Sequence, residues 1–222
     1  MAANPKILTK MVIEICKALA LLSECEIVHS DLKTENILIR TEKEGKDTQL
    51  TEVKLIDYGS SFEFRNIAQF SMATPEYMPP EILNYIIHEN EGEYEEELYQ
   101  RVMNDYRNPW AIDMWSLGCV LLEIVVGVPL WMSLPLLVPG RSGAYLQKEG
   151  LFAVKGRLFP EIIAKQRSVN PHLDEILDRE NHSRIAVSPT MRGVIKAMLD
   201  IDFNRRISPA ETIARLEAEA TD

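Results

Sequence analysis

The fold is decided by the stretch HSDLKTENILI at residues 29–39. Within it an acid, a cation and an amide, Asp31, Lys33 and Asn36, lie between two apolar runs, so one loop can direct all three side chains into a single cavity. A second stretch, LIDYG at residues 55–59, places the carboxylate of Asp57 at the end of an apolar strand. If the two strands pair side by side, Asn36 and Asp57 lie near each other, a geometry that suits a hard cation such as Mg²⁺.

These two stretches resemble the catalytic loop and the magnesium-binding turn of the eukaryotic protein kinases. The resemblance implies that Asp31 is the base that orients the substrate hydroxyl and accepts its proton, and that Lys33 steadies the transferred phosphoryl group. It also implies that Asn36 and Asp57 hold Mg²⁺, that Leu38 forms the floor of the adenine pocket, and that ATP is the phosphoryl donor.

Two positions depart from the family pattern. Family members commonly carry Arg at the position of Ser30, and that Arg usually receives the phosphate of the activation loop. Ser cannot make this bidentate contact, which argues against activation by loop phosphorylation, although a splicing-related subgroup with a small hydroxyl residue here is active. Tyr58 replaces the family's Phe, which keeps an aromatic ring and adds a hydroxyl.

A third match concerns the substrate. Residues 74–81, TPEYMPPE, resemble the end of the family's activation segment, where a protein substrate is held. Thr74 stands where Ser/Thr-specific members place a threonine that bonds the catalytic Asp and Lys. Together with Lys33, it favours a serine/threonine kinase, with dual specificity left open.

Two further matches imply structural roles. Residues 112–124 are apolar almost all round, which predicts a buried helix. By resemblance to the central helix of the kinase large lobe, Asp113 there bonds the backbone of the catalytic loop, and His29 supports the start of that loop. Residues 202–208 resemble the family's closing motif, in which Arg206 pairs with Glu81.

Composition narrows the class of protein. The 222 residues include 24 Lys plus Arg against 34 Asp plus Glu, for a net charge of −10. An acidic balance argues against nucleic acid or an anionic membrane as the partner and favours basic protein substrates. The 3 Cys are widely spaced, which predicts neither a disulfide framework nor a zinc site and fits an intracellular location in cytoplasm or nucleus. No apolar run is long enough to span a membrane.

The expected fold is mainly α, a kinase-like large lobe with a short β-hairpin that carries the catalytic and metal-binding loops. Apolar residues between Leu8 and Leu22 recur at helical spacing, so a helix runs directly into the catalytic loop. No glycine-rich loop or phosphate-binding lysine strand precedes it, and neither Lys6 nor Lys10 is a substitute. Residues 1–222 are therefore expected to form one domain, the carboxy-terminal lobe alone.

Two segments carry specific expectations. The charged residues 41–49, which include Gly45, predict a hairpin connection longer than a tight turn. Residues 88–108 are rich in Glu and longer than the family's spacing, yet their apolar residues recur every fourth position, which predicts an acidic helical insertion. This helix either packs on the lobe or offers a docking surface to a basic partner.

Two principal readings of the function remain. The chain is part of a protein kinase whose small lobe is encoded upstream or supplied separately, or it is a catalytically inactive kinase-like lobe that acts as a binding or regulatory module. A third class, the small-molecule phosphotransferases with a similar loop, is disfavoured by the substrate-segment motif at residues 74–81.

Overall fold

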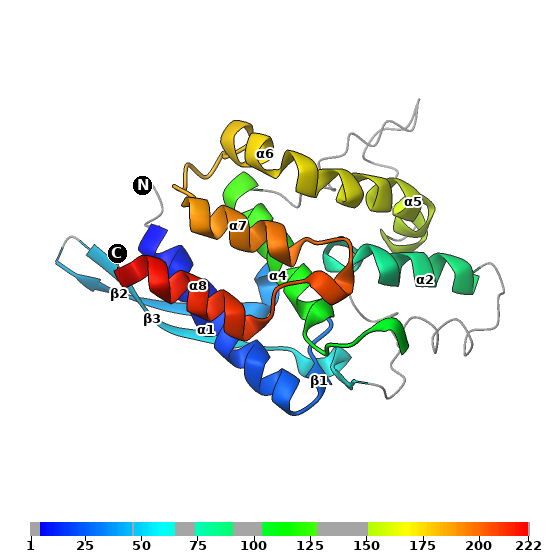
Figure 1. Cartoon of the computed structure of the whole chain (residues 1–222), viewed down its shortest axis with the longest axis horizontal. Coiled ribbons are helices and arrows are strands. Elements are labelled where there is room, and N and C mark those ends of the chain that lie inside the picture. Colours follow the sequence, from blue (N-terminus) through cyan, green and yellow to red (C-terminus); the bar gives the residue numbers. More distant parts are fainter. Residues whose placement is uncertain (1–4, 46, 65–73, 91–103, 128–150, 222) are drawn as a thin grey trace.

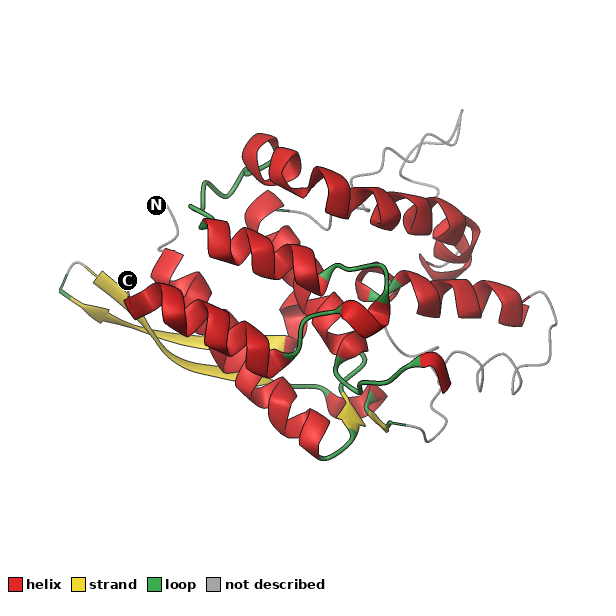
Figure 2. Ribbon diagram, viewed as in Figure 1, coloured by secondary structure: helices red, strands yellow, loops and turns green. Residues whose placement is uncertain are grey.

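The computed structural model describes residues 5–45, 47–64, 74–90, 104–127 and 151–221 and shows a mainly helical chain (Figure 2), which confirms the expected class. Its helices are α1 Pro5–Glu24, α2 Pro80–Asn90, α4 Ala111–Val126, α5 Leu151–Val169, α6 Leu173–Arg179, α7 Pro189–Met198 and α8 Pro209–Thr221. Its strands are β1 Ile27–Val28, β2 Ile37–Glu44, β3 Asp47–Leu55 and β4 Phe62–Glu63. Short 3-10 turns are η1 Thr34–Asn36, η2 Tyr58–Ser60, η4 Pro75–Tyr77, η6 Asn170–His172 and η7 Phe203–Arg205.

Helix α1 confirms the amphipathic pattern near the start of the chain. Its inward face is apolar and lies in the core, since the residues recur at helical spacing: Leu8, Met11, Val12, Ile15, Cys16 and Leu19. The helix lies alongside α8 and packs against β3 of the hairpin (Figure 1). Segments from the two ends of the described chain therefore share one core.

Helix α4 runs through the middle of the molecule and is buried almost all round, as its apolar sequence predicts. It packs closely on α7: a Cβ at Gly118 would lie 2.8 Å from Leu199 Cδ2, so only glycine fits without displacing its neighbours. The helix ends at Gly127, whose φ of 92° lies in the left-handed region that glycine adopts at little cost.

The hairpin corrects one expectation. Residues 41–49 do not form a long connection, because β2 continues to Glu44 and pairs with β3 from Asp47 onward, with Gly45 in the turn at a φ of 63°. The pairing register shifts between Arg40 and Thr41, and the strands stay paired on both sides of this irregularity. The described side chains in this part of the hairpin are exposed, so the strands need no apolar alternation and their polar composition resembles that of a loop.

The open end of this hairpin brings two loops together. Ile37 pairs with Leu55, so the loop that leads into β2 and the turn that follows β3 start side by side. A second, two-stranded antiparallel sheet joins β1 to β4, with Val28 opposite Phe62. The segments on either side of residues 29–36 and 57–61 are thereby fixed to each other.

The carboxy-terminal helices begin where their capping residues predict. Ser188 accepts a hydrogen bond from Met191 N at 3.1 Å at the start of α7, and Ser208 accepts one from Glu211 N at 3.1 Å at the start of α8. Between α4 and α7 the structure describes two further helices, α5 and α6. Helix α5 extends to Val169, with Pro160 inside it.

The expected acidic helical insertion falls largely outside the described residues, because 91–103 are not among them. Its first part, residues 88–90, belongs to α2. At its other end Tyr106 is buried and stacks on Phe203, with ring centroids 4.3 Å apart. The second end of this segment therefore packs on the body of the molecule through Tyr106.

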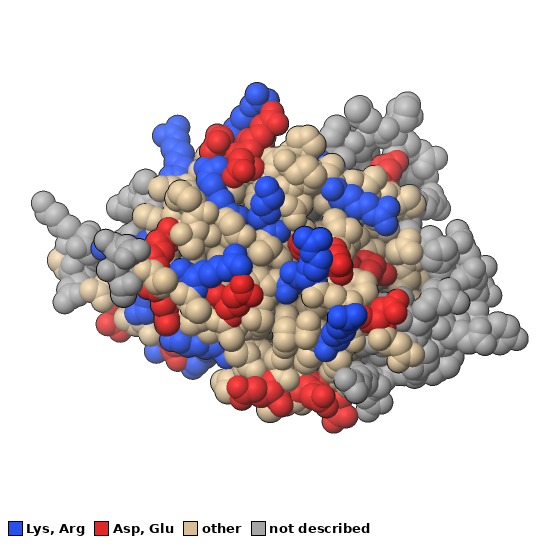
Figure 3. All heavy atoms as spheres, in the orientation of Figure 1, with Lys and Arg blue, Asp and Glu red and all other residues tan. Residues whose placement is uncertain are grey.

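One face of the surface mixes Lys and Arg with Asp and Glu over most of the described residues (Figure 3). Among the helices that the structure describes, none combines the length and the apolar content that a membrane crossing requires.

Candidate functional site

The loop at residues 29–36 is anchored from below by α4. Both carboxylate oxygens of Asp113 accept backbone hydrogen bonds, from His29 N at 2.8 Å and from Ser30 N at 2.9 Å. Asp113 is only 2% exposed, so these two donors compensate for the loss of water around a buried carboxylate. The His29 ring donates from Nε2 to the carbonyl of Ile56 at 3.1 Å, which links this loop to the end of β3.

Asp31 lies at the centre of a network of three side chains. Its Oδ1 accepts from the backbone N–H of Thr74 at 2.9 Å and from the Thr74 hydroxyl at 2.7 Å. Its Oδ2 accepts from Lys33 Nζ at 2.6 Å, and Lys33 also donates to Thr74 Oγ1 at 2.9 Å. Residues that are far apart in sequence thus converge on one carboxylate.

The network controls the ionisation of Asp31. Burial alone would raise its pKa, but the hydrogen bonds from Lys33 and Thr74 and the positive charge of Lys33 outweigh burial and hold the pKa below its ordinary value. Asp31 is therefore an anion at neutral pH, able to accept a hydrogen bond from a hydroxyl placed beside it.

Asn36 and Asp57 are brought to the same end of the hairpin. Ile56 N donates to Asn36 O at 3.0 Å, so Asp57 follows directly after the residue that pairs with Asn36. The Asn36 side chain donates from Nδ2 to Asp31 O at 2.8 Å and to Asp31 Oδ2 at 3.1 Å. Both bonds use the nitrogen of the amide, which leaves its oxygen end to act as a ligand.

This donor set fits Mg²⁺. Asp57 is exposed, with a φ of 62°, and its carboxylate follows directly after the residue whose backbone pairs with Asn36. In the part of the chain that the structure describes, no three His, Cys, Asp or Glu side chains cluster closely enough to cage a metal by themselves. Mg²⁺ is commonly bound by one or two protein oxygen ligands together with phosphates and water, which is what Asn36 and Asp57 can supply.

Apolar side chains border this site. Leu38, on β2 just beyond Asn36, is 52% exposed, and Tyr58 is 48% exposed with its ring centroid 4.9 Å from that of His29. Leu38 thus presents open apolar surface two residues beyond Asn36 on β2.

The predicted support pair lies away from the loops. Arg206 donates from Nη1 to Glu81 Oε1 at 2.7 Å and from Nη2 to Glu81 Oε2 at 2.9 Å, and the Arg206 side chain is fully buried. Tyr106 also donates its hydroxyl proton to Glu81. The structure therefore places Glu81 and Arg206 in the core, where they join α2 to the segment before α8.

A second polar cluster includes Thr34 of the loop and was not predicted from the sequence. Tyr77 donates its hydroxyl to Glu123 Oε2 at 2.5 Å, and Thr34 donates to the same oxygen at 3.3 Å. Burial, followed by the hydrogen bond to Glu123, raises the pKa of Tyr77 above its ordinary value. The three residues come from η4, α4 and η1, so no local sequence pattern joins them.

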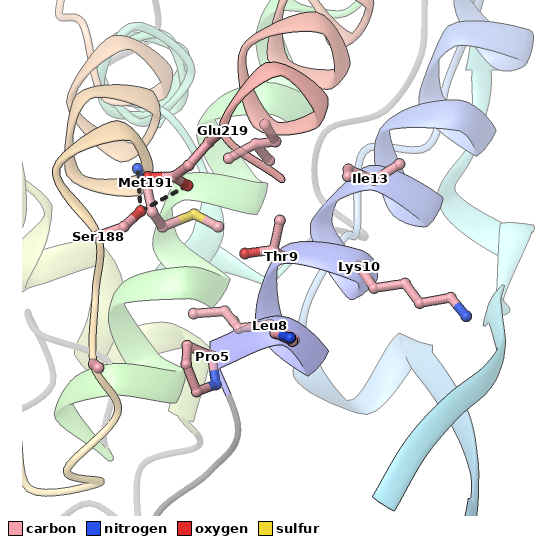
Figure 4. Close-up of a pocket in the computed structure, with 11 residues that line it drawn as sticks. Pro5, Leu8, Thr9, Lys10, Ile13, Ser188, Met191 and Glu219 are labelled. Carbon is pink, nitrogen blue, oxygen red and sulfur yellow. Dashed lines mark hydrogen bonds between the residues drawn. The ribbon is translucent and has the colours of Figure 1, made fainter. Parts of the chain in front are cut away.

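A pocket of about 480 Å³ lies elsewhere, between α1, α7 and α8 (Figure 4). Pro5, Leu8 and Met191 contribute to its apolar wall, and Ser188 donates to Glu219 at 2.9 Å at its edge. None of the loop residues described above lines it, so it is separate from the site at the end of the hairpin.

Comparison with known families decides the class of protein. The family model described as the protein kinase domain matches residues 1–216. The chain belongs to the protein kinase domain family. The hydrogen bonds that join Asp31, Lys33 and Thr74 therefore lie within a protein kinase domain.

The curated relatives of this kinase-family chain are much longer proteins. It is 29% identical over 153 residues to the dual specificity protein kinase YAK1 homolog of Arabidopsis thaliana, covering 69% of this chain and 13% of the relative. It is 32% identical over 118 residues to the serine/threonine-protein kinase ppk15 of Schizosaccharomyces pombe, covering 53% and 17%. It is 34% identical over 119 residues to the probable serine/threonine-protein kinase dyrk2 of Dictyostelium discoideum, covering 53% and 10%. The matched regions thus span less than a fifth of the length of these relatives.

Proposed function

We propose that the chain is the catalytic-loop-bearing part of a serine/threonine or dual-specificity protein kinase, which transfers the γ-phosphoryl group of ATP to a protein hydroxyl. The observation that carries this proposal is the set of hydrogen bonds that joins Asp31, Lys33 and Thr74. A buried carboxylate that stays ionised and accepts four hydrogen bonds is typical of a catalytic site and not of a noncatalytic binding surface.

Each residue has a role in this proposal. Asp31 orients the acceptor hydroxyl and takes its proton, because its carboxylate is ionised and held in place. Lys33 Nζ lies 2.6 Å from Asp31 Oδ2 and offers positive charge to the transferred phosphoryl group. Thr74 fixes the position of both, and it ties the segment before Pro75 to the loop.

Asn36 and Asp57 hold Mg²⁺ in this proposal, and the ion supplies charge neutralisation for the phosphates of ATP. Leu38 offers the apolar surface on which the adenine ring rests. His29, Asp113, Glu81 and Arg206 do not touch substrate; they fix the loop and the body of the molecule.

The chain corresponds in this proposal to the carboxy-terminal lobe of the family. Its mainly helical content supports this assignment. The sequence ahead of the loop at residues 29–36 supports it as well, because the first glycine in the sequence is Gly45 and no glycine-rich loop can therefore precede that loop here. All three cysteines are free thiols, which supports a reducing, intracellular location.

A phosphoryl-transfer assay tests the proposal. The chain is incubated with ATP labelled at the γ-phosphate, Mg²⁺ and a mixture of Ser, Thr and Tyr peptides, with and without a kinase small lobe added in trans. We expect transfer to Ser or Thr that falls about 100-fold or more in Lys33→Ala, while Lys17→Ala, an exposed lysine on α1, leaves it unchanged.

Transfer that is equal in the two variants would contradict the assigned site. Absence of transfer under every condition would leave the noncatalytic module as the better description of the chain.

A further inference from the structure

The turn that carries Asp57, residues 57–61, is attached to the rest of the chain at both ends, and we call it the arch. Before the arch, Ile56 is held on both sides, since its N–H donates to Asn36 O at 3.0 Å and its carbonyl accepts from His29 Nε2 at 3.1 Å. After the arch, β4 pairs with β1, with Val28 opposite Phe62. The position of the arch between these attachments depends on the contacts that residues 58–61 make with the rest of the chain.

Two serines fix its far end. Ser30 donates its hydroxyl to the carbonyl of Ser60 at 2.6 Å, and Ser61 donates its hydroxyl to the carbonyl of His29 at 3.3 Å. The two bonds run crosswise between adjacent residues of the two loops. We call this reciprocal pair, Ser30 and Ser61, the serine clasp.

The local hydrogen bonding of Asp57 is weak. Its backbone is in the left-handed region at a φ of 62°, and its carboxylate accepts one local hydrogen bond, from Gly59 N at 3.4 Å, near the limit for such a bond. A left-handed conformation is costly for a residue other than glycine and persists only where the surroundings impose it. The direction of the Asp57 carboxylate therefore depends on the attachments at the two ends of the arch.

We propose that Ser30 and Ser61 are positioning residues that set the orientation of the metal-binding carboxylate of Asp57 by clasping the catalytic loop to the end of the arch. This inference rests on the proposed function, in which Asp57 holds Mg²⁺. Neither serine touches substrate or metal; both act through the backbone of the turn.

Ser30 is well suited to this task because its own backbone is buried and hydrogen-bonded. It is 8% exposed, its φ is 63°, and its N–H donates to Asp113 Oδ1 at 2.9 Å. A short hydroxyl on a fixed backbone loses little rotational freedom when it bonds, so the clasp holds without any charged group. The two loops are thus fixed to each other by neutral hydrogen bonds within the chain.

Hydrogen–deuterium exchange on the whole chain tests the clasp without reference to activity. Ser30→Ala retains Cβ and the backbone bond to Asp113, so it removes the hydroxyl alone. We expect exchange across residues 56–64 to rise about 3- to 10-fold in Ser30→Ala, which is the effect of losing one hydrogen bond, and to rise less in Ser61→Ala.

Two control variants accompany these. Ser61→Thr keeps the hydroxyl and should show the slow exchange of the unmodified chain. Ser168→Ala, which removes an exposed hydroxyl that donates to a carbonyl on α5, should leave residues 56–64 unchanged.

A second readout concerns Mg²⁺. If the clasp orients Asp57, the apparent affinity for Mg²⁺ in the presence of ATP should fall about 3- to 10-fold in Ser30→Ala, and Ser61→Thr should behave as the unmodified chain does. Unchanged exchange in both alanine variants overturns the clasp. Faster exchange with unchanged Mg²⁺ affinity overturns its positioning role. Faster exchange in a chain that shows no Mg²⁺-dependent ATP binding supports the clasp and counts against the proposed function instead.

Discussion

At the scale of single residues, the chemistry depends on the charge state of Asp31. Hydrogen bonds from Lys33 and Thr74 keep its pKa below the ordinary value of 3.8 in spite of burial. A lowered pKa in the folded state means that the ionised form contributes stability above the unfolded pKa, and that this contribution is lost as pH falls through the folded value.

We therefore predict that Asp31→Asn destabilises the chain by a constant amount between about pH 5 and pH 8, and that the difference from the unmodified chain shrinks below about pH 4. Urea unfolding across this pH range measures the effect, with Glu42→Gln on the exposed part of β2 as a control for loss of one negative charge. A difference that grows as the pH falls would contradict the assigned direction of the pKa shift.

The sequence predicted the polar residues of the loops and the Asp113 support, but not the cluster around Glu123. Asp31, Lys33 and Thr74 were recognisable because each stands in a motif of its own, and the structure brings the three together. The bond between Tyr77 and Glu123 was not predictable, because it joins elements 46 positions apart that carry no shared pattern. Such contacts follow from the packing of α4 against η4, which exists only in the folded chain.

At the scale of elements, apolar periodicity predicted α1 and α4 well, since a buried helix must keep one or all of its faces apolar. The exposed outer half of the hairpin was missed for the opposite reason: Lys43 and Thr48 pair through their backbones, and their polar side chains carry no strand signal. The short sheet between β1 and β4 was also missed, because two-residue strands are too brief for any alternation to appear.

Replacing two helix glycines by alanine should change stability in opposite directions, because Gly118 is closely packed and Gly193 has open space around it. Gly118→Ala on α4 should destabilise the chain by about 1–3 kcal/mol, because the new Cβ would lie 2.8 Å from Leu199 Cδ2 and 3.1 Å from Met198 Cβ. Gly193→Ala on α7 meets nothing within 4 Å and should stabilise it by about 0.5–1 kcal/mol. Denaturant titration of both variants measures the pair, and the same sign for both would contradict the packing of α4 on α7.

At the scale of the whole molecule, the bond between Arg206 and Glu81 connects parts of the chain 125 positions apart. Burial alone would lower the pKa of Arg206, but the charge of Glu81 and its hydrogen bonds outweigh burial, so the guanidinium stays charged in the core. The guanidinium also lies 4.8 Å from the ring centroid of Trp115 on α4. Three separate elements thus meet at one residue.

We predict that Arg206→Ala lowers the free energy of unfolding by about 3–5 kcal/mol, since it leaves Glu81 without its charged partner in a largely buried place. Arg215→Ala removes a guanidinium from an exposed pair with Glu211 on α8 and should cost under about 1 kcal/mol. Equal losses in urea unfolding would show that the buried pair contributes no more to stability than a surface pair does.

The most direct test of the proposed function is calorimetry of ATP binding to this chain with and without Mg²⁺, with Asp57→Ala beside it. We predict binding that requires Mg²⁺ and that becomes at least about tenfold weaker in Asp57→Ala, because the proposed function makes this carboxylate one of two protein ligands for the ion. Glu63→Ala, which removes an exposed carboxylate on β4, should leave the affinity unchanged. Absence of Mg²⁺-dependent binding, or binding that is equally strong in Asp57→Ala, would contradict the assignment of a nucleotide site to the end of the hairpin.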